Sequence, residues 1–286
     1  MPILPISAGQ PSPDLSEHHR YNNRTSADEW DRFAEHRAHL SDLVCAVGGS
    51  TLAVLGAGNC NDLDLGQLAD AFEAIHLLDL DDEAVRRARS RQPEPVAAKL
   101  VLHPPIDLTG AFAELPALRD KTVSPAELVA LSRTSAERVT AAVPERFDTV
   151  LSACLLSQIM FSCYVALGSH PQLPQIGNAL AVAHLRSLLA LARPGGRVLF
   201  VTDTVSSQTF PLEERWGQQP PLALLAHLNQ SDNVLSGTAI SFVNQVLAGE
   251  SSLLVGAPRL IEPWLWRLNP DVTLLVYALL LQRRPA

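Results

Sequence analysis

The chain has 286 residues, of which 47% are hydrophobic, and its formal net charge is -8. This length suits one large domain with insertions, and the hydrophobic content is enough for a substantial core. Nucleic-acid affinity depends on clustered Lys and Arg, so an acidic chain whose only lysines are Lys99 and Lys121 argues against a DNA or RNA partner.

The first residues, 1–20, are rich in proline and polar side chains, and we expect a loose arm there. They lack the basic start and the long apolar stretch of a signal peptide. The longest apolar run, residues 272–281, is too short to cross a bilayer, so we expect a buried strand and no membrane partner. The four cysteines show no C-x-x-C or zinc-ligand spacing, which predicts reduced thiols in a cytoplasmic protein: Cys45, Cys60, Cys154 and Cys163.

A helix is predicted over about residues 27–46. Ser26 and Glu29 have the spacing of a capping box, in which each side chain accepts from the other residue's backbone N–H. We expect an N-terminal arm and cap helix over residues 1–46, followed by the main domain over residues 47–286.

Two histidines on this predicted helix, His36 and His39, lie three residues apart. Such a pair can bind a metal, but no third ligand is nearby. We therefore expect a solvent-exposed helix face and no metal site.

The next feature is an apolar strand, about residues 51–55, that runs into a turn containing Gly56 and Gly58 and then a helix. A second apolar strand ends on Asp79. Glycine lets backbone approach a ligand closely, and a carboxylate at a neighbouring strand tip can accept from ribose hydroxyls. The pair predicts half of a nucleoside-binding α/β domain; the alternatives are a simple tight turn and a helix cap at Asp79.

The turn distinguishes between two nucleoside ligands. The dinucleotide pattern G-x-G-x-x-G requires a third small residue, and Asn61 stands in that place. Asp62 and Asp64 follow; carboxylates would repel a pyrophosphate but suit a ligand with an ammonium and a sulfonium. The sequence therefore favours S-adenosylmethionine over NAD, with one of the two aspartates expected to cap the following helix.

The rest of the chain continues the alternation of strands and helices. Prolines interrupt the third strand, and a serine-proline-alanine-glutamate start is typical of a helix N-terminus. The predicted elements are a helix opened by Asp81, a broken strand over 99–108, an insertion over about 116–145 with a helix starting at Ser124, a strand over 147–154, a helix after it, a helix over about 174–192, a strand over 197–203, a polar lid-like insertion over about 204–258 with one helical stretch, and two final strands joined by a turn at 269–271.

The glycine turn, Asp79 and the run LLALARPGGRVLFVTD (188–203) together resemble class I, Rossmann-like S-adenosylmethionine-dependent methyltransferases. The resemblance covers about residue 50 to the end. It departs from the family at Val54, where an acidic residue is common, and at Cys60, in place of a third glycine. It implies an α/β fold with a seven-stranded mixed sheet, a C-terminal antiparallel hairpin, helices on both faces and an N-terminal helical cap.

The resemblance also implies roles for individual residues. The turn with Gly56 and Gly58 would contact S-adenosylmethionine, and Asp79 would bind its ribose. Asp107 would contact the adenine amino group, unless it only caps its loop; Asp62 would make a polar contact. Ser152, at the tip of the fourth strand, would lie along the methionine portion.

The sequence says less about the part of the site that would bind the methyl acceptor. The segment after the fourth strand lacks the Asn-Pro-Pro-Tyr pattern of DNA amino-group methyltransferases. Asp203, at the tip of the fifth strand, is the candidate general base, and its alternative role is to cap the following turn. The expected activity is methyl transfer to a small-molecule acceptor; the alternatives are a non-catalytic nucleoside-binding module and, less favoured, an NAD-linked oxidoreductase.

Overall fold

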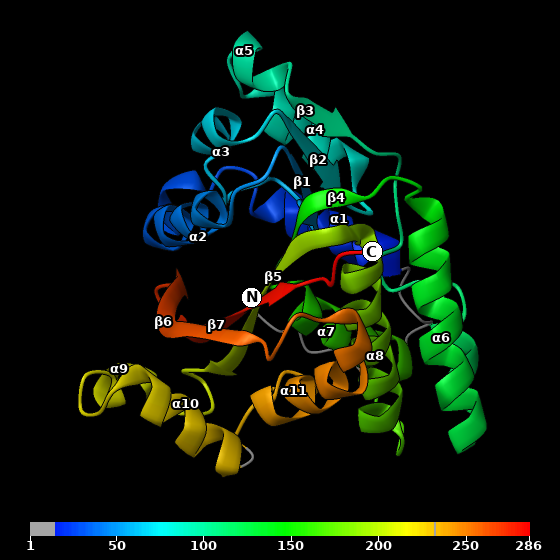
Figure 1. Cartoon of the computed structure of the whole chain (residues 1–286). Coiled ribbons are helices and arrows are strands. Elements are labelled where there is room, and N and C mark those ends of the chain that lie inside the picture. The colour runs from blue at the N-terminus through cyan, green and yellow to red at the C-terminus, as the bar shows by residue number, and fades with distance from the viewer. Residues whose placement is uncertain (1–14, 232) are drawn as a thin grey trace.

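A computed structural model describes residues 15–231 and 233–286. A single seven-stranded sheet runs through the molecule with helices on both faces (Figure 1), in the order β3-β2-β1-β4-β5-β7-β6. The strands are β1 (Thr51–Leu55), β2 (Ala74–Leu78), β3 (Leu100–Leu102), β4 (Phe147–Ala153), β5 (Ala192–Ser206), β6 (Arg259–Asn269) and β7 (Val272–Gln282).

One strand of the sheet, β7, runs opposite to the other six. β3, β2, β1, β4 and β5 are parallel, whereas β7 pairs antiparallel with both β5 and β6. β4 lies in the centre and is buried along its whole length, as expected for a parallel strand covered on both faces. The predicted Rossmann-like mixed sheet with a C-terminal antiparallel hairpin is therefore confirmed.

Two hydrophobic clusters bury the two faces of the sheet. α2 (Ala34–Val47), α3 (Leu65–Ala71) and α4 (Asp82–Ser90) cover one face. α6 (Pro125–Ala142), α7 (Leu155–Leu167), α8 (Leu173–Leu191), α10 (Pro221–Gln230) and α11 (Ile240–Gly249) contribute to the other. Short elements connect these layers: α5 (Glu94–Ala97), α9 (Leu212–Arg215) and the 3-10 turns η1 (Trp30–Phe33), η2 (Leu115–Leu118) and η3 (Ser251–Leu253).

The N-terminal region differs from the sequence prediction. Residues 1–14 of the expected arm lie outside the described residues, but helix α1 (Leu15–Thr25) occupies the remainder. The prediction of a capping box at Ser26 is wrong. The Ser26 hydroxyl donates back to the Asn22 carbonyl, and the next helical turn begins only at Trp30. The helix predicted over about 27–46 therefore starts later, as η1 followed by α2, and α1 is a further helix where part of the loose arm was expected.

Of the two predicted insertions, one has the expected helix start and the other has more helices than expected. Ser124 and Glu127 form the predicted capping box at the start of α6. The segment over 204–258 contains α9, α10 and α11 rather than one helical stretch. The interrupted third strand ends at Leu102, and the part after its two prolines forms a loop instead of strand. Among the helices of residues 15–231 and 233–286, none combines the length and hydrophobicity needed to span a bilayer.

Candidate functional site

The glycine turn lies at the carboxyl edge of the parallel strands, where ligands bind in open α/β sheets. Gly56 and Gly58 have φ values of 77° and 48°, which glycine adopts without steric cost. The N–H groups of Gly56 and Ala57 both donate to the Leu78 carbonyl, so the turn after β1 is tied to the end of β2. The turn and the tip of β2 therefore form one rigid unit.

Asp79 joins this unit through its carboxylate. One oxygen accepts from the Gly58 N–H at 2.8 Å and the other from the Asp81 N–H at 2.8 Å. Burial raises the pKa of Asp79 to about 6, although both hydrogen bonds oppose this shift. Asp79, which is predicted to bind the ribose, therefore lies at the tip of β2. It also makes the local turn that was its alternative role, and ribose binding stays a prediction.

Three carboxyl groups gather around two buried thiols at this edge. Asp62 and Asp79 both raise the pKa of Cys60, and Asp203 and Asp62 both raise that of Cys154, in addition to the larger effect of burial. Burial is also the main influence on the carboxyls: it raises the pKa of Asp62 to about 6 and raises that of Asp203. A cationic ligand would relieve this desolvated acidic cluster, whereas a pyrophosphate would be repelled.

Asp203 is the most enclosed member of the cluster. Its side chain is 6% exposed, and the Ser157 hydroxyl, from the first turn of α7, donates to one carboxylate oxygen at 2.6 Å. The hydroxyl partly offsets the effect of burial on the Asp203 pKa. Sequence reasoning placed Asp203 at the tip of β5, but the contact with Ser157 depends on the packing of α7 against β5 and has no signal in the sequence.

Two residues predicted to contact the cofactor, Ser152 and Asp107, bond to other parts of the chain. Ser152 has no exposed surface, and its hydroxyl lies 2.8 Å from Nε2 of His184 on α8, so it faces the core and not the edge of the sheet. The Asp107 carboxylate accepts from the Thr109 N–H and hydroxyl and from the Phe112 N–H, which is the capping role given as its alternative. The Ser152 hydroxyl is thus bonded to His184 and the Asp107 carboxylate to its own loop, and cofactor contacts of both residues stay predictions.

Asp64 and Asp81 act as expected. Asp64 is the N-cap of α3 and accepts from the Gln67 N–H. Asp81 is the N-cap of α4 and accepts from the N–H groups of Glu83 and Ala84. One of the two aspartates after the glycine turn therefore caps a helix, which leaves Asp62 as the one directed to the cluster.

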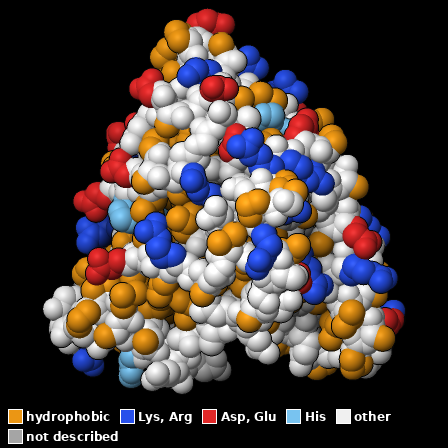
Figure 2. Space-filling model, in the orientation of Figure 1, with side chains coloured by type: hydrophobic (Ala, Val, Ile, Leu, Met, Phe, Trp, Pro, Cys, Tyr) orange, Lys and Arg blue, Asp and Glu red, His pale blue; other side chains and the backbone are white. Residues whose placement is uncertain are grey.

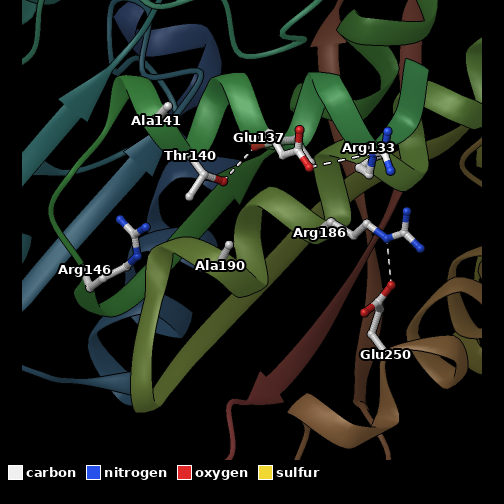
Figure 3. Close-up of a pocket in the computed structure, with 9 residues that line it drawn as sticks. Arg133, Glu137, Thr140, Ala141, Arg146, Arg186, Ala190 and Glu250 are labelled. Carbon is white, nitrogen blue, oxygen red and sulfur yellow. Dashed lines mark hydrogen bonds and ion pairs between the residues drawn. The ribbon is translucent and has the colours of Figure 1, made fainter. Parts of the chain in front are cut away.

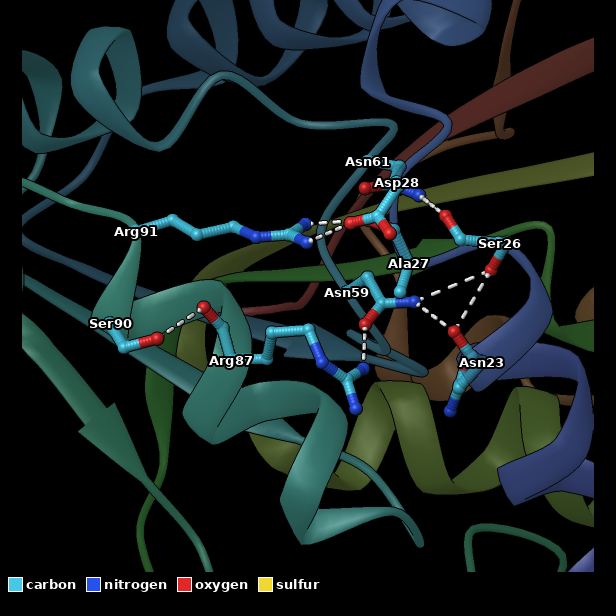
Figure 4. A network of polar contacts seen from close by, with 9 residues as sticks. All are labelled: Asn23, Ser26, Ala27, Asp28, Asn59, Asn61, Arg87, Ser90 and Arg91. Carbon is cyan, nitrogen blue, oxygen red and sulfur yellow. Dashed lines mark hydrogen bonds and ion pairs between the residues drawn. The ribbon is translucent and has the colours of Figure 1, made fainter.

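A polar network that sequence reasoning missed holds the N-terminal segment over the glycine turn (Figure 4). The Asn59 amide donates to the Asn23 carbonyl, and Arg87 of α4 donates to the Asn59 side-chain oxygen. Asn61 donates to the Ser26 carbonyl, so the two asparagines of the turn bind the end of α1 and the segment just after it. Arg91 adds bonds to Ala27 and Asp28.

Helix α1 itself covers the glycine turn. The Asn23 amide donates to the Asp81 carboxylate at 3.0 Å, and a Cβ on Gly58 would lie 3.1 Å from the Asn23 side-chain oxygen. A side chain at position 58 would therefore meet the N-terminal segment first. The N-terminal cap was predicted, but these contacts join residues 35–58 positions apart and could not be.

A separate groove of about 760 Å³ lies between α6 and α8 (Figure 3). Its polar side chains are paired locally: Arg186 with Glu250, Arg133 with Glu137, and the Thr140 hydroxyl with the Ala136 carbonyl. None of the carboxyls at the sheet edge lines it. We assign no chemistry to this groove.

The desolvated carboxyl of Asp62 has a measurable consequence. Its pKa is about 6 in the folded protein and close to 3.8 when unfolded, so the native state binds more protons and stability falls as the pH rises from about 4 to 6. Asp62→Asn removes this penalty. We expect the variant to be more stable than the parent by about 1–3 kcal/mol at pH 8, with the difference disappearing near pH 4. Urea unfolding at both pH values measures it; a difference independent of pH would contradict the assignment.

Comparisons with known proteins add the following findings. No protein-family model matches the chain, and no curated protein matches it. Three solved structures that match are an S-adenosylmethionine-dependent methyltransferase from Anabaena variabilis (14% identity, TM-score 0.49, covering 98% of this chain and 100% of that one), a DhpI-SAM-HEP complex (14%, 0.46, 94% and 99%) and the YcgJ protein from Bacillus subtilis (10%, 0.45, 87% and 99%). At these identities and TM-scores the similarities carry no argument about activity.

Proposed function

We propose that this chain, whose sheet has the strand order and terminal hairpin of the class I methyltransferase fold, binds S-adenosylmethionine at the carboxyl edge of that sheet and transfers its methyl group to a small molecule. The observation that carries the proposal is the position of Asp79. It follows β2 directly and bonds the Gly58 N–H of the neighbouring turn, so a nucleoside bound at this edge would meet both groups.

The donor set fits this cofactor on its own chemistry. Asp79 can accept from ribose hydroxyls, because each carboxylate oxygen has a second lone pair beyond its bond to a backbone N–H. Asp62 and Asp203, whose pKa values burial raises, offer negative charge to the ammonium and sulfonium groups. An NAD pyrophosphate would be placed against the same carboxyls, which disfavours the oxidoreductase alternative.

The residues of this chain have limited tasks in such a reaction. The bound cofactor supplies an electrophilic methyl group, and the chemistry is an in-line displacement that positioning can accelerate strongly. Asp79 and the glycine turn fix the nucleoside. Asp203 would receive the proton that the acceptor atom loses when it takes the methyl group in place of the thioether sulfur. Burial raises the pKa of Asp203, which makes its carboxylate a stronger base than an exposed aspartate.

Calorimetric titration with S-adenosylhomocysteine and, separately, with NAD tests the proposal. We expect S-adenosylhomocysteine to bind and NAD not to bind, because the cluster is acidic. Binding of NAD in preference would support the oxidoreductase alternative. Cofactor binding combined with no methyl transfer to any acceptor in a broad small-molecule panel would support the non-catalytic module instead.

A second prediction concerns macromolecular partners. On the face shown in Figure 2, Lys and Arg side chains are mostly scattered among hydrophobic and uncharged groups and do not form a continuous basic stripe. With the net charge of -8, we expect only weak, non-specific affinity for duplex DNA or RNA at physiological salt. Fluorescence anisotropy with labelled duplexes at several salt concentrations measures this. A micromolar or tighter complex with a steep salt dependence would overturn the small-molecule acceptor.

A further inference from the structure

A second hollow, of about 720 Å³, lies at the outer edge of the sheet near the turn between β6 and β7. Residues from η1, α2, α9, β6 and the turn after β6 surround it, and none of the carboxyls of the proposed cofactor site lines it. We call it the hairpin groove. Its lining residues include Asp31, Arg32, Glu35, His36, Glu213, Trp266 and Arg267.

His36, expected on an exposed helix face, is buried in the wall of this groove. It is 3% exposed, and its ring stacks on that of Trp266 with the centroids 4.1 Å apart and an angle of 17°. Trp264, from the same strand, donates its indole N–H to Nδ1 of His36 at 3.1 Å. The expectation of a solvent-exposed face is therefore wrong for His36, because two tryptophans about 230 residues away cover it.

The bond from Trp264 determines the tautomer of His36. Indole can only donate, so Nδ1 of His36 must be the unprotonated nitrogen. Burial lowers the pKa of His36 to about 3, and the nearby His39 acts in the same direction, so the ring is neutral at pH 7. Its one proton is consequently on Nε2. This N–H is buried, and no atom of the described residues accepts from it.

A second donor in the same wall is also unsatisfied. Nε1 of Trp266 is buried and has no hydrogen-bond partner within residues 15–231 and 233–286. Buried N–H groups without acceptors are rare in folded proteins because desolvation is then not compensated. Here two of them lie on a pair of stacked rings, and an acceptor from outside the chain could satisfy both.

The charges around the groove limit the kind of ligand. Arg32 pairs with Glu29, and Arg267 pairs with Glu213, so a carboxylate offsets each positive charge. Asp31 and Glu35 add further negative charge to the lining. An anionic ligand would be repelled, whereas an uncharged molecule with oxygen acceptors would not.

We propose that the hairpin groove is a second ligand site, which takes an uncharged planar molecule bearing a carbonyl oxygen, of the aromatic amide class. The ligand ring packs against the aromatic wall, and its carbonyl oxygen accepts from Nε1 of Trp266 and Nε2 of His36. Both rings belong to the lining of the groove. The volume is in the range of small-molecule pockets.

Titration with benzamide, followed through the indole N–H signals in a nitrogen–proton correlation spectrum, tests the proposal in the full chain without cofactor. We expect the Trp266 signal to move downfield and to saturate. Toluene, which lacks an acceptor, should leave that signal near its free position, and benzoate should bind at least tenfold more weakly than benzamide. No saturable shift with benzamide, an equal shift with toluene, or tighter binding of benzoate would each overturn the proposal.

Two matched variants separate binding from folding. Trp266→Phe keeps an aromatic ring and removes an unsatisfied donor, so it should weaken benzamide binding at least tenfold while lowering the melting temperature little. Trp264→Phe removes a satisfied donor and leaves Nδ1 of His36 without a partner, so its melting temperature should fall further. If Trp266→Phe is destabilised as much as Trp264→Phe, or binds benzamide like the parent, the unsatisfied donor is not a binding group and the proposal fails.

Discussion

Asp79→Ala is expected to weaken S-adenosylhomocysteine binding by about 1.5–3 kcal/mol, the range for hydrogen bonds to a charged group, which corresponds to about 10- to 150-fold in affinity. The physical reason is that the carboxylate stands at the tip of β2 and bonds the Gly58 N–H, so it would face the ribose hydroxyls. Calorimetric titration measures the affinity, and thermal unfolding checks that the variant folds.

Asp82→Ala is the control for this change. It removes a carboxylate three residues along, at the start of α4, whose partner is Arg86 on the helix surface. We expect its affinity for S-adenosylhomocysteine to match that of the parent. If Asp79→Ala folds and binds as tightly as Asp82→Ala, Asp79 does not contact the ribose.

Asp203→Asn is expected to lower the turnover of any accepted substrate by ~10²–10⁴, the usual contribution of a general base. The substitution preserves shape, and the remaining side-chain oxygen can still accept from the Ser157 hydroxyl. The ability to take a proton and the negative charge are both lost, so turnover is compared at saturating cofactor. Steady-state kinetics measures the loss, and cofactor affinity is measured separately.

Ser157→Ala provides the matching control. Its hydroxyl lowers the pKa of Asp203 against the effect of burial, so removing it should raise that pKa and move the rise of activity with pH to a higher pH. Turnover at high pH, where Asp203 is ionised in both proteins, should be similar. Unchanged turnover in Asp203→Asn would leave Asp203 a structural residue and positioning as the only catalytic device.

The sequence by itself determined the features that depend on neighbouring residues. The glycine turn after β1, the N-caps Asp64 and Asp81, the capping box of Ser124 and the final hairpin all follow from interactions between residues a few positions apart. Such signals do not depend on the rest of the chain. The order of strands and helices, and with it the fold, could therefore be predicted.

Only the tertiary structure decided where individual polar side chains point. Ser152 is at the expected strand tip, yet it faces His184 because α8 covers that side of β4. Ser26 fits a helix start, but its hydroxyl bonds the preceding helix and its carbonyl accepts from Asn61. His36 is buried by Trp264 and Trp266. In each case the deciding partner is brought close by packing between distant segments, and hydrophobic periodicity predicts that a face is buried without predicting which residues it meets.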